Sequence, residues 1–268
     1  MQGRLGGVQK KTPGSSLAFA RRGFGRGSYS QYTLPMPINQ GIKFTSLIKS
    51  VSEQRLAPYY KDKDESPELA LARYAWNITL CEALYPALNV VEVVLRNNLH
   101  AALMTLYGEE WYCLPHFLRD AEVRQIEDAK NEIVKEKKAC TPGHILAGLS
   151  FGFWVTLLGR HYEQKIFHRL AQAILPNMPT TLRKRKHIAS RLHKVRFSLR
   201  NRAFHHEPIW KNPSLLQNHD DMLETISWLN REAHDFVLAI DRFKNIYQAG
   251  YQPLIEKIRN LHALEGRQ

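Results

Sequence analysis

The sequence RFSLRNRAFHHEPIW, residues 196–210, places three arginines and two adjacent histidines in one short stretch of chain. Histidine exchanges protons near neutral pH, and neighbouring cations favour its neutral form, which accepts a proton. Arginine stays charged, and its planar guanidinium binds two phosphoryl oxygens at once. These residue types predict acid–base chemistry beside a phosphate group, with His205 as the proton carrier and Arg200 as the cation.

The spacing of these residues indicates which of them can act together. Arg196 and Arg200 are four residues apart, so a helix places them on one face. His205 follows Arg200 by five residues, about 140° around a helix, so the two do not lie side by side. Pro208 disfavours helical geometry at Glu207, and the helix should therefore end near the histidines. At such an end, Arg200 and His205 can converge on one ligand.

Further polar residues complete the predicted site. Asn201 lies four residues before His205, so its amide can hydrogen-bond to the imidazole or donate to phosphate. One histidine cannot readily serve as both acid and base, so the second comes from His206 or from the partner subunit's His205. Arg196 and Arg202 are expected to bind the substrate.

The site ends a strongly basic segment, residues 181–206, which carries nine Lys or Arg and no acidic residue. Its apolar residues recur at spacings of three and four and predict an inward stripe: Ile188, Leu192, Val195, Leu199 and Ala203. The cations then face outward or flank this stripe, as in a helix that follows a phosphate backbone. Lys184 and Arg185 are the expected phosphate contacts. The alternative is a basic helix that is merely solvated, although nine uncompensated cations repel one another.

A second polar group lies in the apolar segment ALNVVEVVLRNNLHAALMTL, residues 87–106. Asn89, Glu92, Arg96 and His100 fall at spacings of three and four, so they form one stripe on a helix expected to be buried. Glu92 precedes Arg96 by four residues, the favourable order for an ion pair. One interpretation is a satisfied buried salt bridge. The other is a polar cavity in which Glu92 and Arg96 bind substrate, because buried ion pairs alone stabilise weakly.

Helical periodicity dominates the chain from Ser66 onward, and no segment alternates at period two, so the fold class is all-α, a helical bundle. Pro86 is expected to separate two helices. The buried face of the first should carry Leu71, Tyr74, Ile78, Cys81 and Tyr85. Further helices are expected over about 119–138, 142–159, 162–174 and 181–206, with a short one after Pro253. A long helix from about Asp220 should bury one stripe: Met222, Ile226, Leu229, Ala233, Phe236, Ile240 and Phe243.

The 268-residue chain carries a formal charge of +13, which indicates a polyanionic partner, either nucleic acid or an acidic membrane surface. Residues 1–35 hold six basic residues, seven glycines and no acidic residue. Removing those six charges from +13 leaves +7. We expect residues 1–40 to be a disordered basic tail or an upstream extension with Met36 as the true start, and residues 41–268 to form one helical domain.

The cysteines and the most apolar segment indicate whether the protein binds a structural metal or spans a membrane. Cys81, Cys113 and Cys140 are far apart and match no zinc spacing, so they are expected to be reduced thiols of a cytoplasmic protein without a metal. The uncharged run 142–159 barely reaches the length of a membrane span and contains internal glycines. It is therefore expected to be a buried core helix, and no signal peptide is visible.

The end of the basic segment and five earlier segments resemble those of a known family. SLRNRAFHHEPIW is similar to the C-terminal signature of the Abi-like (abortive infection) proteins of the HEPN superfamily. Five earlier segments resemble the family's blocks in its order: SEQRLAPYY, YAWNITLCEALYPAL, VEVVLRNNLHAAL, YGEEWY and LSFGFWVTLL. Together they cover roughly residues 45–265.

The resemblance implies an antiparallel helical bundle with additional helices and an Arg-x4-His motif, here Arg200 and His205 with the polar Asn201. It implies a metal-independent endoribonuclease without cofactors, acting in phage defence or as the toxin of a toxin–antitoxin pair, usually as a homodimer. Glu92-x3-Arg96 is similar to a second polar element of the superfamily. The tyrosine whose modification silences some relatives is missing from HHEPIW, which puts that form of antitoxin control in doubt.

Two other classes compete with a ribonuclease that cleaves RNA. A non-catalytic helical module that binds RNA or a protein partner would keep the basic helix but tolerate loss of His205. A membrane-associated protein would be built around residues 142–159.

Overall fold

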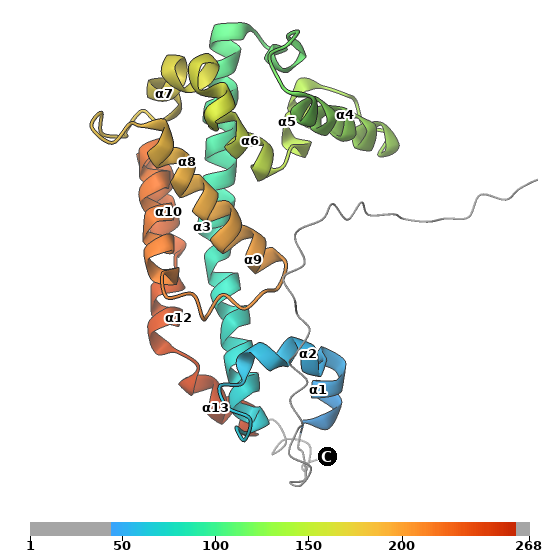
Figure 1. Cartoon of the computed structure of the whole chain (residues 1–268), viewed down its shortest axis with the longest axis vertical. Coiled ribbons are helices and arrows are strands. Elements are labelled where there is room, and N and C mark those ends of the chain that lie inside the picture. Colours follow the sequence, from blue (N-terminus) through green and yellow to red (C-terminus); the bar gives the residue numbers. More distant parts are fainter. Residues whose placement is uncertain (1–43, 261–268) are drawn as a thin grey trace, which may run out of the picture. The chain divides into compact units, whose positions relative to one another are not determined.

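The computed structural model describes residues 44–260, and this part of the chain contains helices and connecting segments but no β-strand (Figure 1). The predicted all-α class is confirmed for these residues. The predicted basic tail, residues 1–40, and the first and last residues of the predicted domain 41–268 lie outside them.

The central element is α3 (Pro67–Tyr107), a helix of 41 residues and about 60 Å. Ser66 precedes it, Pro67 is its first residue, and it stops at Gly108, whose φ of 86° suits glycine. The expected break at Pro86 is wrong, because the helix continues through the proline. Pro86 removes one backbone hydrogen bond, but Leu84 and Leu88 are buried on either side and hold the helix in the core.

The buried face of α3 also differs from the expected one. Leu71 is buried as expected, but Ile78 and Tyr85 are 51% and 54% exposed. Most of the face that packs inward is formed by other residues: Trp76, Leu80, Leu84, Leu88, Val91, Leu95 and Leu99. Both sets recur at spacings of three and four. A helix that is apolar on nearly every side does not reveal from periodicity which stripe faces the core.

Shorter helices precede and follow α3. Before it lie α1 (Thr45–Val51), α2 (Glu53–Leu56) and the 3₁₀ turn η1 (Ala57–Tyr59). After it come η2 (Trp111–Cys113), α4 (Asp120–Lys135), α5 (Pro142–Gly148), α6 (Phe151–Leu157), η3 (Arg160–Tyr162), the π-helical turn η4 (Glu163–Phe167) and α7 (His168–Ile174). Helix α7 packs against α3, and α4 packs against α5.

The apolar run 142–159 is buried mainly in its second half, and it forms two helices instead of the one expected buried helix. Leu149 is extended and ends α5, and the Ser150 hydroxyl accepts a hydrogen bond from the Phe153 N–H to begin α6. Within residues 44–260, only α3 is long and apolar enough to cross a membrane. In the fold, α3 is the helix against which α7, α10, α11, α12 and α13 pack.

The expected long helix from Asp220 is wrong, because three helices occupy this segment: α10 (Leu215–Leu229), α11 (Arg231–Ile240) and α12 (Phe243–Ala249). Asn230 is extended, and its side chain accepts a hydrogen bond from the Ala233 N–H to begin α11. Of the expected stripe, Phe236 and Ile240 are exposed. The short helix expected after Pro253 is α13 (Gln252–Arg259).

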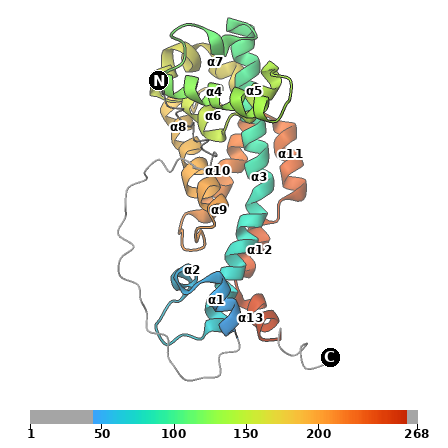
Figure 2. The same cartoon turned by 90° about the vertical axis from the view of Figure 1, so that its right-hand side faces the viewer.

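The basic segment forms one continuous helical stretch that begins at Arg185, four residues later than expected. It consists of α8 (Arg185–Lys194), the π-helical turn η5 (Val195–Arg200) and α9 (Asn201–Phe204). The expected inward stripe is confirmed, since Ile188, Leu192, Val195, Leu199 and Ala203 are all buried. Helix α8 packs against α6 and α10, and η5 packs against α3 and α10 (Figure 2).

Candidate functional site

The two histidines lie where the basic helix ends. The Glu207 N–H donates to the Arg202 carbonyl at 2.8 Å, and the His206 N–H donates to the Ala203 carbonyl at 3.2 Å. This is the hydrogen-bond pattern of a Schellman cap, in which the residue after the helix adopts a left-handed conformation. His206 occupies that position with a φ of 58°. Both imidazoles are exposed, so the cap presents two proton carriers to solvent.

The segment that follows the histidines is fixed to α3 by the buried amide of Asn77. Its Nδ2 donates to the Glu207 carbonyl at 3.3 Å, and its Oδ1 accepts from the Ile209 and Trp210 N–H groups at 2.7 and 3.3 Å. From α2, Arg55 Nη1 donates to the His206 carbonyl at 2.7 Å. These contacts set the exit direction of the chain and therefore the place of the histidines. Sequence reasoning missed Asn77, whose only signal was an amide on an apolar helix face.

A buried ion pair at the N-terminal end of α3 packs against the same segment, residues 207–210. Arg73 is 2% exposed and binds the Glu65 carboxylate with two nitrogens at 2.5 and 2.6 Å. This hydrogen bonding lowers the pKa of Glu65. The Arg73 guanidinium also lies 6.0 Å from the Trp210 ring centroid, and that ring stacks with Tyr59 at 6.2 Å. The loop after the motif is thus packed on a buried ion pair and on the aromatic rings beside it.

The two predicted polar groups meet in space. Arg200 Nε lies 4.0 Å from Glu92 Oε2, and each side chain is about one third exposed. Arg200 Nη1 also donates weakly to the neighbouring Asn201 Oδ1 at 3.5 Å. The guanidinium carbon is 5.0 Å from the centroid of the Phe204 ring. Arg200 therefore sits on an aromatic face with a carboxylate beside it.

Two expected contacts are not formed within residues 44–260. Glu92 faces Arg200 instead of pairing with Arg96, whose Nε donates to the adjacent Asn97 at 3.2 Å. Asn201 and His205 are joined through the backbone, with no hydrogen bond between their side chains. In both cases the spacing permitted the contact, but Glu92 and the Asn201 amide each contact Arg200 instead.

The expectation that the Asn89–His100 stripe is buried is also wrong. Asn89 is exposed, and Glu92 and Arg96 are intermediate. His100 accepts a hydrogen bond from Trp111 Nε1 at 3.1 Å, and burial lowers its pKa. The stripe thus has two parts. Glu92 is partly exposed and lies near Arg200, whereas His100 forms a structural hydrogen bond with Trp111 of η2.

Arg196 adds a second cation on the π-helical turn. Its guanidinium packs on Gly152 of α6 so closely that a Cβ there would lie 2.6 Å from it. Burial, together with the nearby Arg200 charge, lowers the pKa of Arg196. No carboxylate among residues 44–260 forms an ion pair with it. Arg196 is therefore a half-buried cation that an anionic ligand would neutralise, and π-turns of this kind are frequent at functional sites.

The other predicted substrate contacts differ in position. Arg202 is engaged locally, with Nε 3.2 Å from Glu207 and Nη2 donating to the Pro208 carbonyl at 3.1 Å. Arg185 is 11% exposed and pairs with Glu163 at 2.9 Å. Lys184 is exposed just before α8. Arg185 lies fifteen residues before Arg200, about 22 Å along the helix, so this end could contact only a distant part of a long substrate.

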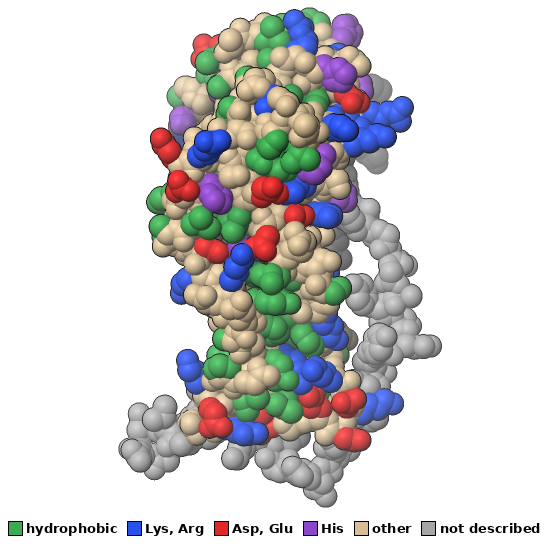
Figure 3. All heavy atoms as spheres, turned by 90° about the vertical axis from the view of Figure 1, so that its left-hand side faces the viewer, with side chains coloured by type: hydrophobic (Ala, Val, Ile, Leu, Met, Phe, Trp, Pro, Cys, Tyr) green, Lys and Arg blue, Asp and Glu red, His purple; other side chains and the backbone are tan. Residues whose placement is uncertain are grey.

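Carboxylates from other parts of the chain neutralise more of the positive charge on the basic helix than the sequence of the helix alone indicates. Five of its nine cations form ion pairs with carboxylates outside residues 181–206, namely Arg185, Arg191, Lys194, Arg200 and Arg202. The pair between Arg191 and Glu224 is the shortest, at 2.6 Å. On the face shown in Figure 3, acidic side chains likewise lie among the basic ones. The inference of nine uncompensated cations is wrong, and Arg196 is the uncompensated one nearest the histidines.

No protein-family model, curated protein or solved structure gives a match to this chain. The chain's own residues therefore have to carry the functional conclusion. They provide two exposed imidazoles and two arginines within residues 196–206, and the carboxylate of Glu92 lies beside Arg200 from α3. No group of three or more His, Cys, Asp or Glu side chains placed to hold a metal occurs among residues 44–260.

Replacing Asn77 by leucine should lower the free energy of unfolding by about 2–3 kcal/mol, because the buried Ile209 N–H and its neighbour lose their acceptor. Urea denaturation followed by circular dichroism measures this loss. The matched control is Asn89→Leu on the exposed side of the same helix, which should change stability by less than about 0.5 kcal/mol. Equal effects of the two substitutions would contradict the role of Asn77 as a clamp.

His206→Gly should stabilise the protein by about 0.5–1 kcal/mol, because glycine adopts the left-handed conformation without the strain of a Cβ. His205→Gly is the matched control, since His205 has a φ of −92° and should gain nothing from glycine. Thermal melting compares the two variants. A lower melting temperature for His206→Gly would show that the imidazole makes stabilising contacts.

Proposed function

We propose that this protein is a metal-independent endoribonuclease of Abi-like, HEPN-type architecture that cleaves RNA with its Arg-x4-His motif. The observation that carries the proposal is the cap of α9, which presents His205 and His206 one turn beyond an arginine held by Glu92. The segments that resemble the Abi-like proteins supply the structural supports of this cap, since Arg55 and Asn77 both belong to them.

The chemistry follows from the needs of RNA cleavage without a metal. A base removes the proton of a ribose 2′-OH, whose oxygen attacks the adjacent phosphorus while the bond to the 5′-oxygen breaks. An acid protonates that leaving oxygen, and a cation stabilises the phosphorane. His205 serves as one proton carrier, and His206 or the partner subunit's His205 serves as the other. The products are a 2′,3′-cyclic phosphate and a 5′-hydroxyl.

Arg200 is suited to the phosphorane, because the contact with Glu92 leaves most of its donors unused. At 4.0 Å, Glu92 orients the guanidinium by charge without a direct hydrogen bond to it. Arg196, which has no carboxylate partner in residues 44–260, would bind a second phosphoryl oxygen or the neighbouring phosphate. Asn201 steadies Arg200 from the adjacent position.

The proposal extends to partners and setting. RNA is the substrate, and a homodimer would place two motifs across one cleft. A small antitoxin or another defence protein would control the activity in a cytoplasmic phage-defence or toxin–antitoxin system. The protein would need no cofactor and no membrane.

A second candidate function is a non-catalytic helical module that binds RNA or a protein. The observation in its favour is the apolar exposure beside the motif, where Tyr85 and Phe204 are 54% and 48% exposed. Such a module would tolerate loss of His205 without loss of function.

The purified protein should cut single-stranded RNA in excess EDTA, and the same strand 2′-O-methylated at the cut site should bind but stay intact. His205→Ala should slow cleavage by roughly 10²–10⁴-fold, as expected for loss of a positioned acid or base. Arg200→Ala should be at least as damaging. The readouts are single-turnover rates on gels and end-group analysis of the products.

His193→Ala is the matched control, because His193 is an exposed histidine on α8 of the same helical stretch and should keep full activity. Lys184→Ala should weaken binding and flatten its salt dependence without changing the rate of the bound complex. Cleavage that requires a metal and leaves a 5′-phosphate would overturn the mechanism, and an undiminished His205→Ala rate would overturn the site assignment.

If the active site is shared between subunits, mixing the inactive Arg200→Ala and His205→Ala proteins should restore part of the activity. Subunit exchange forms mixed dimers in which one subunit supplies Arg200 and the other supplies His205. Each variant mixed only with itself is the control and should stay inactive. Analytical ultracentrifugation determines the oligomeric state, and a fully active monomer would contradict the shared site.

A further inference from the structure

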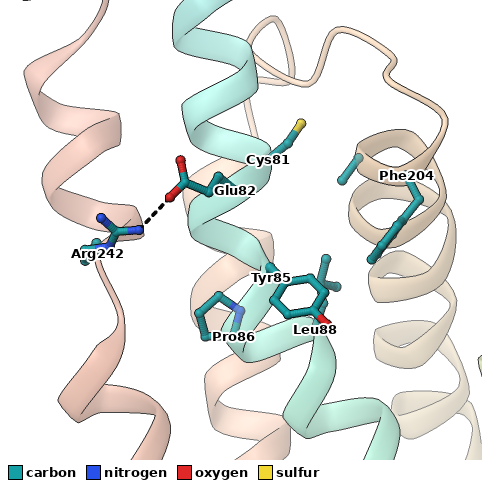
Figure 4. Close-up of a pocket in the computed structure, with 8 residues that line it drawn as sticks. Cys81, Glu82, Tyr85, Pro86, Leu88, Phe204 and Arg242 are labelled. Carbon is teal, nitrogen blue, oxygen red and sulfur yellow. Dashed lines mark hydrogen bonds and ion pairs between the residues drawn. The ribbon is translucent and has the colours of Figure 1, made fainter.

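A pocket of about 420 Å³ lies between α3 and α9, beside the candidate site (Figure 4). Cys81, Tyr85, Pro86 and Leu88 form its wall on α3, and Phe204 closes it from α9. Burial raises the pKa of the Cys81 thiol to about 11, so the thiol is uncharged at neutral pH. The volume is within the range of pockets that hold small ligand groups.

Two aromatic rings dominate this pocket, and both are unusually accessible. Tyr85 is 54% exposed and Phe204 is 48% exposed, with ring centroids 6.3 Å apart and planes inclined at 60°. Neither ring contributes to the buried core of residues 44–260. Rings left open in this way offer flat apolar faces for stacking.

The cation that we assign to the phosphate does not line the pocket but contacts Phe204, which does. The Arg200 guanidinium lies 5.0 Å from the Phe204 ring centroid, and Phe204 directly precedes His205 in the chain. A nucleotide whose phosphate rests on Arg200 would bring its base within reach of Phe204. The pocket thus adjoins the reaction centre on its apolar side.

The mouth of the pocket carries an ion pair with both charges exposed. Arg242 Nη2 lies 2.8 Å from Glu82 Oε1, and the side chains are 63% and 61% exposed. A carboxylate accepts from the amino groups of a base edge, and a guanidinium donates to its ring nitrogens and carbonyl oxygens. An apolar pocket with an acceptor and a donor at its rim therefore complements a nucleobase, which has apolar faces and a polar edge.

We propose that this pocket binds an unpaired nucleobase next to the phosphate at Arg200 and thereby selects single-stranded RNA. The proposal rests on the proposed ribonuclease function and names its substrate class. A base in a duplex is stacked and paired, so it cannot enter a side pocket, whereas an unpaired base can stack on Tyr85 and Phe204. The other candidate occupant is an apolar side chain of a second copy of this chain.

The probe for this test is a single-stranded 2′-O-methyl RNA of nine nucleotides, which binds but cannot be cleaved. One version is made for each position with the fluorescent base 2-aminopurine there, and a fluorescein-labelled version reports affinity by anisotropy. In the wild-type protein, quenching should concentrate at one or two positions, where the base stacks. A duplex of the same sequence should compete poorly.

Tyr85→Ala and Phe204→Ala should each weaken binding by about 5- to 150-fold, as for loss of one stacked base, and should abolish the quenching. Tyr85→Phe keeps the ring and should behave like the wild type. Ile78→Ala is the matched control, because Ile78 is 51% exposed on α3 but does not line the pocket. All these side chains are about half exposed, so the substitutions should leave the fold intact.

The possible outcomes separate this inference from the proposed function. Normal RNA cleavage with unchanged affinity and quenching in both alanine variants would overturn the pocket assignment and leave the ribonuclease intact. The expected binding pattern without any cleavage of unmodified RNA would support the pocket and overturn the ribonuclease. A wild-type protein that quenches no position would also overturn the assignment. So would alanine variants that lose a dimer in ultracentrifugation but keep wild-type affinity and quenching, since the pocket would then hold a second copy.

Discussion

The buried amide of Asn77 forms three hydrogen bonds with the backbone of residues 207–210. These bonds tie a loop to the middle of the core, about 130 residues away in sequence. The cap of α9 fixes the two imidazoles relative to Arg200, and the Asn77 bonds fix the direction in which the chain leaves that cap. The loop after the motif therefore depends on one polar group in an apolar helix.

The remaining supports act in the same direction. Arg55 holds the His206 carbonyl, and the Arg73–Glu65 pair underlies Trp210 at the end of the loop. Farther along α3, Glu92 lies 4.0 Å from Arg200, a distance at which it orients the guanidinium without saturating its donors. Rigid supports beneath exposed, partly unsatisfied groups are the arrangement that a ligand-binding site requires.

Much of this arrangement could be predicted from sequence, but only where the signal is local. The inward stripe of α8 and α9, and the end of the helix before Pro208, follow from periodicity and from proline geometry. The continuity of α3 through Pro86 could not be predicted, because burial on both sides of the proline outweighs the lost hydrogen bond. The choice of Glu92 between Arg96 and Arg200 also depends on where η5 packs against α3. For the same reason Asn77 gave no sign of its role, since its partners are distant in sequence.

The π-helical turn Val195–Arg200 accommodates one surplus residue without loss of the helical register on either side. Because the widened backbone of the turn absorbs that residue, α8 and α9 keep one common register. Removing a single residue from the turn would therefore restore a regular helix in which Ile188 and Ala203 still face the core and the two histidines still end the helix. Arg196 and Arg200 lie on the widened backbone itself, so they are the side chains that would move. The π-turn thus sets the position of the two cations separately from the position of the histidines.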